Sequence, residues 1–208
     1  MKTDSRLHGL YAITHQGYSG IEQLLQETEA ALKGGARIVQ YRDKSADPHQ
    51  RQEQASELAG LCRHHQASLI INDDVELAIT VGAQGVHLGK DDDDIVKARA
   101  LLGPEAIIGI SCYNQLALAE HAAAAGASYV AFGSFYPSPT KPDAVRASTE
   151  LLTRWSEFSL PSCAIGGITL DNAAPLISAG ASMLAVISDL WSAPDIEQHA
   201  RRFAALWD

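Results

Sequence analysis

The amino-acid sequence predicts an α/β fold, a single-domain (β/α)8 TIM barrel formed by residues 1–208. The first observation is a Gly-Ala pair that precedes an apolar run at four places, beginning at Gly35, Gly82, Gly126 and Gly180. Glycine is the residue expected just after a helix and just before a buried strand. The copies lie 47, 44 and 54 residues apart, a spacing that fits two βα units rather than one.

The second observation is a further apolar run between successive copies, with one more before the first copy. Eight short apolar runs result, at residues 10–13, 38–39, 69–71, 85–86, 107–110, 129–130, 163–165 and 183–184. They lack polar alternation, as expected for strands that are buried on both faces. Eight units in 208 residues average 26 residues each, which is compact but sufficient for a barrel.

Helical patterns lie between these runs. Residues 21–32 carry an apolar stripe with the i, i+3, i+4, i+7 spacing, and residues 196–207 do likewise. Pro48, Asp94 and Asp171 stand where the second, fourth and seventh helices should begin.

A doubly wound open sheet is the alternative architecture. It usually carries a glycine-rich phosphate-binding turn after its first strand, and residues 13–17 do not form one. The longest irregular segment runs from Gly133 to Asp143 and contains three prolines, which predicts a long loop after the sixth strand.

Charge and composition exclude several classes of function. The net charge is −9 at pH 7, so the chain lacks the basic surface that a nonspecific nucleic-acid or anionic-membrane binder needs. No apolar run reaches the length of a membrane span, and the first residues contain no signal-peptide hydrophobic region. Cys62, Cys112 and Cys163 form no paired motif, so we expect reduced, buried cysteines in a cytoplasmic protein. The sequence leaves open whether the chain forms a homo-oligomer.

Carboxylates follow two successive strands of the predicted barrel. The loops after barrel strands open onto one face, so residues from different loops form a common site. Asn72 and Asp73 follow the third strand, and an acidic run, Asp91–Asp94, follows the fourth. Such an oxygen-rich set of side chains is suited to Mg²⁺.

Cations and small residues follow the other strands. Arg42, Lys44 and Lys141 would surround a cleft next to the metal, an arrangement that can hold a diphosphate and stabilise its departure. Gly167 and the Ile187-Ser188 pair follow the seventh and eighth strands, where many barrels bind a monophosphate. Two phosphate-binding regions predict two phosphorylated substrates. Further polar residues at strand ends and in these loops are Gln40, Ser111, Ser138 and Thr140.

Each of these features also has a purely structural interpretation. The acidic run could be the negative start of a helix, and Asp74 could be a helix cap. Arg42 and Lys44 could be solvated charges or pair with Asp43 and Asp47. His87 could be a hydrogen-bonded interior side chain. Convergence at matching strand ends favours the functional interpretation.

With these residues in view, the chain resembles the thiamine-phosphate synthase family over nearly its whole length. The matching segments are Gln40 to Lys44, Ile71 to Asp73, Gly85 to Asp92, Gly109 to Ser111, Ser138 to Lys141, Ala164 to Ile168 and Ile187-Ser188. The family joins hydroxymethylpyrimidine diphosphate to hydroxyethylthiazole phosphate and releases pyrophosphate. The diphosphate is thought to leave first, and the thiazole nitrogen then attacks the pyrimidine-methyl cation.

The resemblance implies a role for each matching residue. Asp73 and Asp92 correspond to the Mg²⁺ ligands. The positions that hold the pyrimidine diphosphate correspond to Gln40, Arg42, Lys44, Asn72, Ser111 and Lys141, of which Arg42, Lys44 and Lys141 would act in catalysis. The positions around the thiazole phosphate correspond to Ser138, Thr140, Gly167, Ile187 and Ser188.

The chain departs from the family pattern at Lys90, where Gln is usual, and at Ser138, where Thr is usual. A thiazole tautomerase of the same fold, or a non-catalytic protein that binds thiazole or thiamine phosphate, is the alternative function. Neither needs a metal-bound diphosphate site, so the co-occurrence of Asp73, Asp92 and Lys141 favours the synthase.

Overall fold

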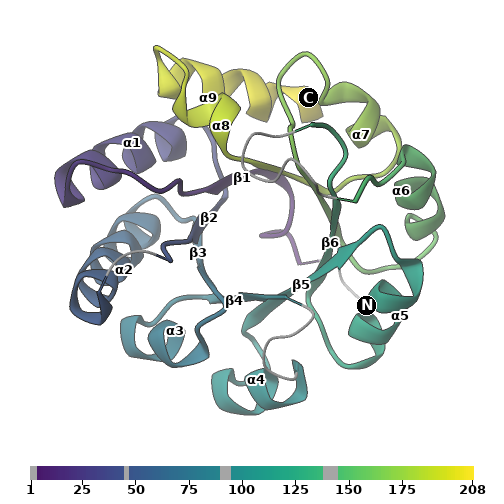
Figure 1. The fold of residues 1–208 in the computed structure, drawn as a ribbon, viewed down its shortest axis with the longest axis horizontal. Helices are drawn as coiled ribbons and strands as arrows, with labels where there is room; N and C mark the ends of the chain where they lie inside the picture. Colours follow the sequence, from purple (N-terminus) through teal and green to yellow (C-terminus); the bar gives the residue numbers. More distant parts are fainter. Residues whose placement is uncertain (1–3, 45–46, 90–94, 138–144) are drawn as a thin grey trace.

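The computed structural model describes residues 4–44, 47–89, 95–137 and 145–208 and shows a closed barrel of eight parallel strands. Each strand pairs with the next in sequence, and β1 pairs with β8, which closes the ring (Figure 1). The strands are β1 Gly9–Ile13, β2 Ile38–Tyr41, β3 Ser68–Asn72, β4 Gly85–Leu88, β5 Ile107–Tyr113, β6 Tyr129–Gly133, β7 Ser162–Ile165 and β8 Met183–Val186. The barrel prediction is confirmed, and closure excludes the open sheet.

Helices surround the strands as an outer ring (Figure 1). They are α1 Ile21–Lys33, α2 Pro48–His64, α3 Val75–Val81, α4 Ile95–Leu102, α5 Leu116–Ala124, α6 Thr149–Trp155, α7 Ala174–Ser178, α8 Ser188–Trp191 and α9 Ile196–Ala204, followed by a short 3-10 helix, η1 Ala205–Trp207. Gly34 lies so close to α9 that an added Cβ would lie 2.4 Å from the Glu197 carbonyl oxygen. The close approach of α1 and α9 completes the helical ring.

Of the three predicted helix starts, one is confirmed, one lies outside the described residues and one is corrected. Pro48 begins α2, and Asp47 before it caps the helix by accepting a hydrogen bond from the Gln50 N–H. Asp94 lies outside the described residues. The seventh helix begins at Ala174 instead of at Asp171, because residues 170–173 form turns and a bend in which Asn172 accepts a hydrogen bond from the Thr169 N–H.

Two apolar layers hold the barrel together. The larger layer lies between the strands and the helices, and residues of α1 such as Leu24 and Ala31 belong to it. The smaller layer fills the barrel interior and includes Tyr11, Ile70 and Tyr129. Because successive strand residues point to opposite faces, every second residue enters the interior. Cys62, Cys112 and Cys163 are free and buried, as predicted.

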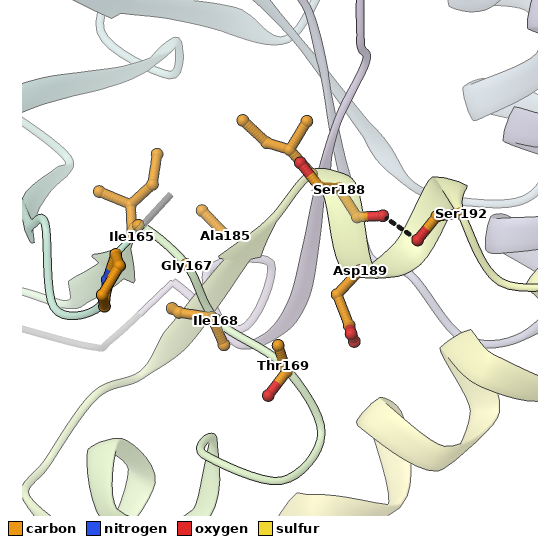
Figure 2. Close-up of a pocket in the computed structure, with 11 residues that line it drawn as sticks. Ile165, Gly167, Ile168, Thr169, Ala185, Ser188, Asp189 and Ser192 are labelled. Atoms are coloured by element: carbon orange, nitrogen blue, oxygen red, sulfur yellow. Dashed lines mark hydrogen bonds between the residues drawn. The ribbon is translucent and has the colours of Figure 1, made fainter. Parts of the chain in front are cut away.

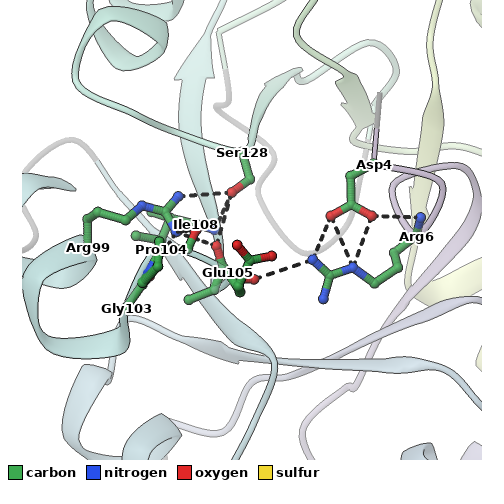
Figure 3. A network of polar contacts seen from close by, with 9 residues as sticks. Asp4, Arg6, Arg99, Gly103, Pro104, Glu105, Ile108 and Ser128 are labelled. Atoms are coloured by element: carbon green, nitrogen blue, oxygen red, sulfur yellow. Dashed lines mark hydrogen bonds and ion pairs between the residues drawn. The ribbon is translucent and has the colours of Figure 1, made fainter. Parts of the chain in front are cut away.

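Polar side chains tie together the loops at the amino ends of the strands (Figure 3). The Arg99 guanidinium donates to the backbone carbonyls of Gly103, Pro104, Ala106 and Gly126. On the same end, Arg6 pairs with Asp4 at 2.6 Å and donates to the Glu105 carbonyl. None of the helices in the described ranges is both long and apolar enough to cross a membrane.

Candidate active site

The predicted residues of strands two to five lie at the carboxyl end of the barrel. Gln40, Asn72 and Ser111 occupy the last inward-facing positions of β2, β3 and β5. Their neighbours two residues earlier are Ile38, Ile70 and a glycine, and the two isoleucines belong to the interior apolar layer. The interior is therefore apolar in its middle and becomes polar where the strands end.

Asp73 contacts polar side chains from the ends of both β2 and β3. Its φ angle of 64° is left-handed, and its backbone N–H donates to the His87 carbonyl of β4 at 2.9 Å. Asx residues tolerate this conformation better than most others. The Asn72 amide donates to Asp73 Oδ2 at 2.6 Å, and Lys44 Nζ lies 3.4 Å from the same oxygen. An amide, a carboxylate and a cation from two neighbouring strand ends therefore meet here.

Arg42 differs from the other arginines discussed above. Its backbone N–H donates to Thr14 Oγ1 at 2.9 Å, which ties the end of β2 to the end of β1. Within the described part of the chain, its half-buried guanidinium has no hydrogen-bond or ion-pair partner. A cation that is held in place by its backbone and has no internal partner is suited to an anionic ligand.

The structure shows the partners of two nearby charged residues, Asp74 and Lys44. Asp74 caps α3 by accepting the Leu77 N–H at 2.8 Å, and it also pairs with Arg51 at 2.8 Å, so this residue has a structural role. Lys44 pairs with Asp73 across the strand ends instead of with Asp47, whose carboxylate caps α2.

A separate pocket of about 280 Å³ lies where β7 and β8 end (Figure 2). Gly166, Gly167, Ile187 and Ser188 line it, so the three predicted monophosphate residues that the structure describes, Gly167, Ile187 and Ser188, are brought together. A Cβ added to Gly167 would lie 2.3 Å from the Pro137 carbonyl oxygen, and the φ angle of this residue is 62°. Glycine is therefore required by both conformation and close packing of the loops after β6 and β7.

The same pocket contains residues that the sequence did not indicate. Thr169, Asp189 and Ser192 line it, and the Ser192 hydroxyl donates to the Ser188 carbonyl at 2.7 Å (Figure 2). Asp189 also contacts His199 of α9, with 2.7 Å between the carboxylate and Nε2. These residues belong to α8, to the turn after it and to the loop after β7. The four-residue α8 is too short to leave a periodic signal in the sequence.

Several predicted residues lie outside the described part of the chain. They are Asp92, Ser138, Thr140 and Lys141, together with Lys90. Their assignment stays a prediction. Among the residues that the structure does describe, no group of three or more His, Cys, Asp or Glu side chains is arranged to hold a metal ion.

Polar side chains also occupy the interior of the barrel. Gln40 Nε2 donates to the Tyr11 hydroxyl at 2.7 Å, which lies 2.8 Å from the Tyr129 hydroxyl. His87 Nδ1 lies 2.8 Å from Tyr129 Oη, and His87 Nε2 lies 2.9 Å from Ser111 Oγ. Burial raises the pKa values of Tyr11 and Tyr129, so both hydroxyls are protonated at neutral pH. His87 is thus an interior, hydrogen-bonded histidine, as its structural interpretation predicts.

Similarity to known proteins identifies the family to which this chain belongs. The family model described as thiamine monophosphate synthase matches residues 10–190. The chain belongs to the thiamine-phosphate synthase family, which is an enzyme family of transferases. A thiamine-phosphate synthase of Thioalkalivibrio sulfidiphilus is 56% identical over 100% of this chain and 99% of its own length. One from Thiobacillus denitrificans is 58% identical over 95% of each chain.

Solved structures show the same relationship. The thiamine phosphate pyrophosphorylase of Pyrococcus furiosus superposes with a TM-score of 0.85 at 33% identity, covering 97% of this chain and 95% of its own. A 3-hexulose-6-phosphate synthase superposes with a TM-score of 0.68 at 16% identity, covering 94% of this chain and 99% of its own. The latter likeness shows the barrel fold alone. These comparisons confirm the resemblance to the thiamine-phosphate synthase family that the sequence shows.

Proposed function

We propose that this member of the family is a Mg²⁺-dependent thiamine-phosphate synthase. It would join hydroxymethylpyrimidine diphosphate to hydroxyethylthiazole phosphate, giving thiamine phosphate and pyrophosphate. The observation that carries the proposal is the 3.4 Å contact between Lys44 and Asp73 at the ends of neighbouring strands. This contact supports the proposal because it brings a lysine that would bind the diphosphate beside a carboxylate that would bind the metal. Identity of more than half to named synthases over nearly the whole chain supports the same function.

The donor atoms at the end of β3 fit a magnesium ion. Mg²⁺ prefers oxygen ligands and is commonly held by one or two carboxylates together with substrate phosphates. Asp73 offers a carboxylate, and Asn72 supports it with an amide hydrogen bond of 2.6 Å. Asp92 would provide the second carboxylate. Bound Mg²⁺ supplies positive charge that offsets the charge of the departing diphosphate.

The cations of the chain would act on the same diphosphate. In the proposed reaction, the bond between the pyrimidine methylene carbon and the diphosphate oxygen breaks, and its electron pair leaves with the diphosphate. Arg42, Lys44 and Lys141 would bind the diphosphate oxygens and stabilise the charge that develops on them. Lys44 can exchange its contact with Asp73 for the substrate, because its side chain is more than half exposed.

The remaining site residues would orient the two organic groups. Gln40, Asn72 and Ser111 would hold the pyrimidine side of the first substrate. The pocket at the ends of β7 and β8 would bind the phosphate of the thiazole, through Gly167, Ile187 and Ser188 with Ser138 and Thr140. The thiazole nitrogen would then donate its lone pair to the methylene carbon, and holding both partners in place lowers the entropic part of the barrier.

The test is to incubate the protein with both substrates and Mg²⁺ and to measure thiamine phosphate and pyrophosphate together. We expect equal amounts of the two products, and no product when Mg²⁺ is chelated or either substrate is omitted. Interconversion of thiazole tautomers without use of the pyrimidine substrate would show a tautomerase instead. Binding of thiazole phosphate or thiamine phosphate without any turnover would show a non-catalytic protein. Either result would overturn the proposal.

A further inference from the structure

A continuous line of hydrogen bonds crosses the barrel interior between two of the proposed substrate-binding residues. It runs from the Gln40 amide through the hydroxyls of Tyr11 and Tyr129 and the ring of His87 to the Ser111 hydroxyl, in four steps of 2.7, 2.8, 2.8 and 2.9 Å. The residues come from β2, β1, β6, β4 and β5, so the line joins opposite sides of the barrel. The proposed reaction uses only the two ends of this line, Gln40 and Ser111.

The packing of the interior holds this line in place. Tyr11 and Tyr129 are 1% and 0% exposed, so neither hydroxyl can turn to water. The Tyr129 ring stacks on His87 with centroids 5.6 Å apart and meets Tyr11 edge-on at 6.0 Å. Gly109 makes room for the Tyr129 ring, because a Cβ at that position would lie 2.0 Å from the ring.

With Gln40 Nε2 as the first donor, one arrangement of protons gives both tyrosine hydroxyls and the ring N–H of the line an acceptor. Gln40 Nε2 donates to Tyr11, so the Tyr11 proton points to Tyr129. The Tyr129 proton then points to His87 Nδ1, which accepts it. A neutral imidazole whose Nδ1 accepts carries its proton on Nε2, and that proton points to Ser111 Oγ.

We propose that Tyr11, Tyr129 and His87 are positioning residues that fix the Nε2–H tautomer of His87 and hold the Ser111 hydroxyl as a hydrogen-bond donor toward the substrate. Ser111 receives a hydrogen bond from His87, so its own proton is directed away from the ring. The Gln40 amide is held in one orientation by the same line, with Nε2 facing Tyr11. Two binding groups on opposite sides of the barrel are thereby ordered together, before any ligand arrives. The role of Ser111 toward substrate rests on the proposed function.

The first test needs no substrate. Nitrogen NMR of protein labelled with ¹⁵N-histidine reports which ring nitrogen carries the proton, and a His87→Gln variant assigns the signal. We expect the Nε2–H tautomer in the native protein. In Tyr129→Phe, where the acceptor Nδ1 loses its donor, we expect a measurable population of the other tautomer. A native His87 protonated on Nδ1 alone would overturn the proposal, whatever reaction the protein catalyses.

The second test measures coupling in the reaction. Tyr129→Phe keeps the ring and removes one hydroxyl, and we expect kcat/KM for the pyrimidine diphosphate to fall about tenfold, with KM for the thiazole phosphate unchanged. In a Ser111→Ala background the same change should cost less than about threefold, because the hydroxyl it positions is gone. If the loss of kcat/KM in the double variant equals the product of the losses in the two single variants, the proposal is contradicted.

Tyr41→Phe is the matched control. The Tyr41 hydroxyl is also buried and donates to a glutamine, Gln54 Oε1, at 2.6 Å, but it belongs to the layer between the barrel and the helices. We expect Tyr41→Phe to lower the melting temperature by an amount similar to Tyr129→Phe and to leave both kinetic constants within about twofold. An equal loss of kcat/KM in both variants would show a general packing effect and would overturn the positioning role. If no thiamine phosphate forms at all, the tautomer measurement still decides the proposal.

Discussion

At the amino ends of the strands, the Arg99 guanidinium donates to four backbone carbonyls, and Arg6 is paired with Asp4. At the carboxyl ends, the guanidinium of Arg42 has no partner within the described residues, and Lys44 extends to the carboxylate of Asp73. Arg99 and Arg6 join loops at the amino end, whereas Arg42 and Lys44 at the carboxyl end are available to a ligand. From this difference we predict that substituting these residues at the amino end mainly lowers stability, whereas substituting those at the carboxyl end mainly lowers activity.

The largest effect is expected for Asp73→Asn. Asparagine tolerates the left-handed backbone of this position, so the fold should be retained. The carboxylate proposed to bind the metal is lost, and we expect the rate of thiamine phosphate formation to fall by about a thousandfold or more. Steady-state kinetics and thermal unfolding of the same sample check this prediction. A variant that keeps more than a tenth of the rate would show that the Asp73 carboxylate does not bind the metal.

A pair of arginine variants tests the comparison most broadly. Arg42→Ala should lower kcat/KM for the pyrimidine diphosphate about a hundredfold and leave the melting temperature nearly unchanged. Arg99→Ala should leave kcat/KM within about twofold and destabilise the fold by about 2–3 kcal/mol, because several backbone carbonyls lose a charged donor. Steady-state kinetics and denaturant unfolding measure kcat/KM and the free energy of unfolding for both variants. A large loss of stability in Arg42→Ala would remove the distinction between the two ends.

Two glycine variants sharpen the comparison. Gly167 and Gly82 have similar left-handed φ angles of 62° and 64°, but only a Cβ at Gly167 would meet another atom, the Pro137 carbonyl oxygen. Gly82 caps α3 at the amino end of the barrel, with nothing within 4 Å of an added Cβ. Backbone strain should cost each alanine variant about 1 kcal/mol of stability, and Gly167→Ala should lose more because its Cβ also meets the Pro137 carbonyl oxygen.

Activity should separate these two variants. Gly167→Ala should displace the loops around the proposed monophosphate pocket, so we expect KM for the thiazole phosphate to rise about tenfold. Gly82→Ala should keep its native KM. Equal KM values in the two variants would show that the pocket between β7 and β8 does not bind this substrate.

The smallest effect is expected for the Asp4–Arg6 pair. The Arg6 guanidinium lowers the pKa of Asp4 in the folded protein below its ordinary value. The pair therefore stabilises the fold above that ordinary value, and its contribution disappears as the pH falls through the lowered pKa. Asp4→Asn should cost less than about 1 kcal/mol at pH 7, because the pair is partly exposed. Unfolding curves of the two proteins should converge in strong acid, with activity at pH 7 unaffected.

The sequence predicts the fold well because the signals are local. The Gly-Ala pairs before four of the strands and the apolar runs without alternation are properties of short segments, and all eight strands are found where the apolar runs lie. The rule that barrel loops share one face brings Lys44 near Asp73, although 29 residues separate them. The start of α7 was wrong because a polar turn intervenes between Asp171 and the helix.

The polar interior line could not be predicted in the same way. Whether Tyr11 faces Tyr129 depends on the register and tilt of strands on opposite sides of a closed barrel, which no short segment encodes. A signal does exist in the alternation of inward residues, since Tyr11, Tyr129 and His87 all stand at positions that face the interior. Two tyrosines and a histidine at such positions indicate polar contacts, but not their order.

Binding of Mn²⁺ in place of Mg²⁺, followed by electron paramagnetic resonance, tests the central claim most directly. The protein is titrated with Mn²⁺ in the presence of inorganic pyrophosphate, the proposed product, and Asp4→Asn serves as the matched control from the amino end. We predict that the native protein and Asp4→Asn bind Mn²⁺ together with pyrophosphate and that Asp73→Asn does not. Undiminished binding by Asp73→Asn would contradict the account, because the metal and the diphosphate would then lie elsewhere.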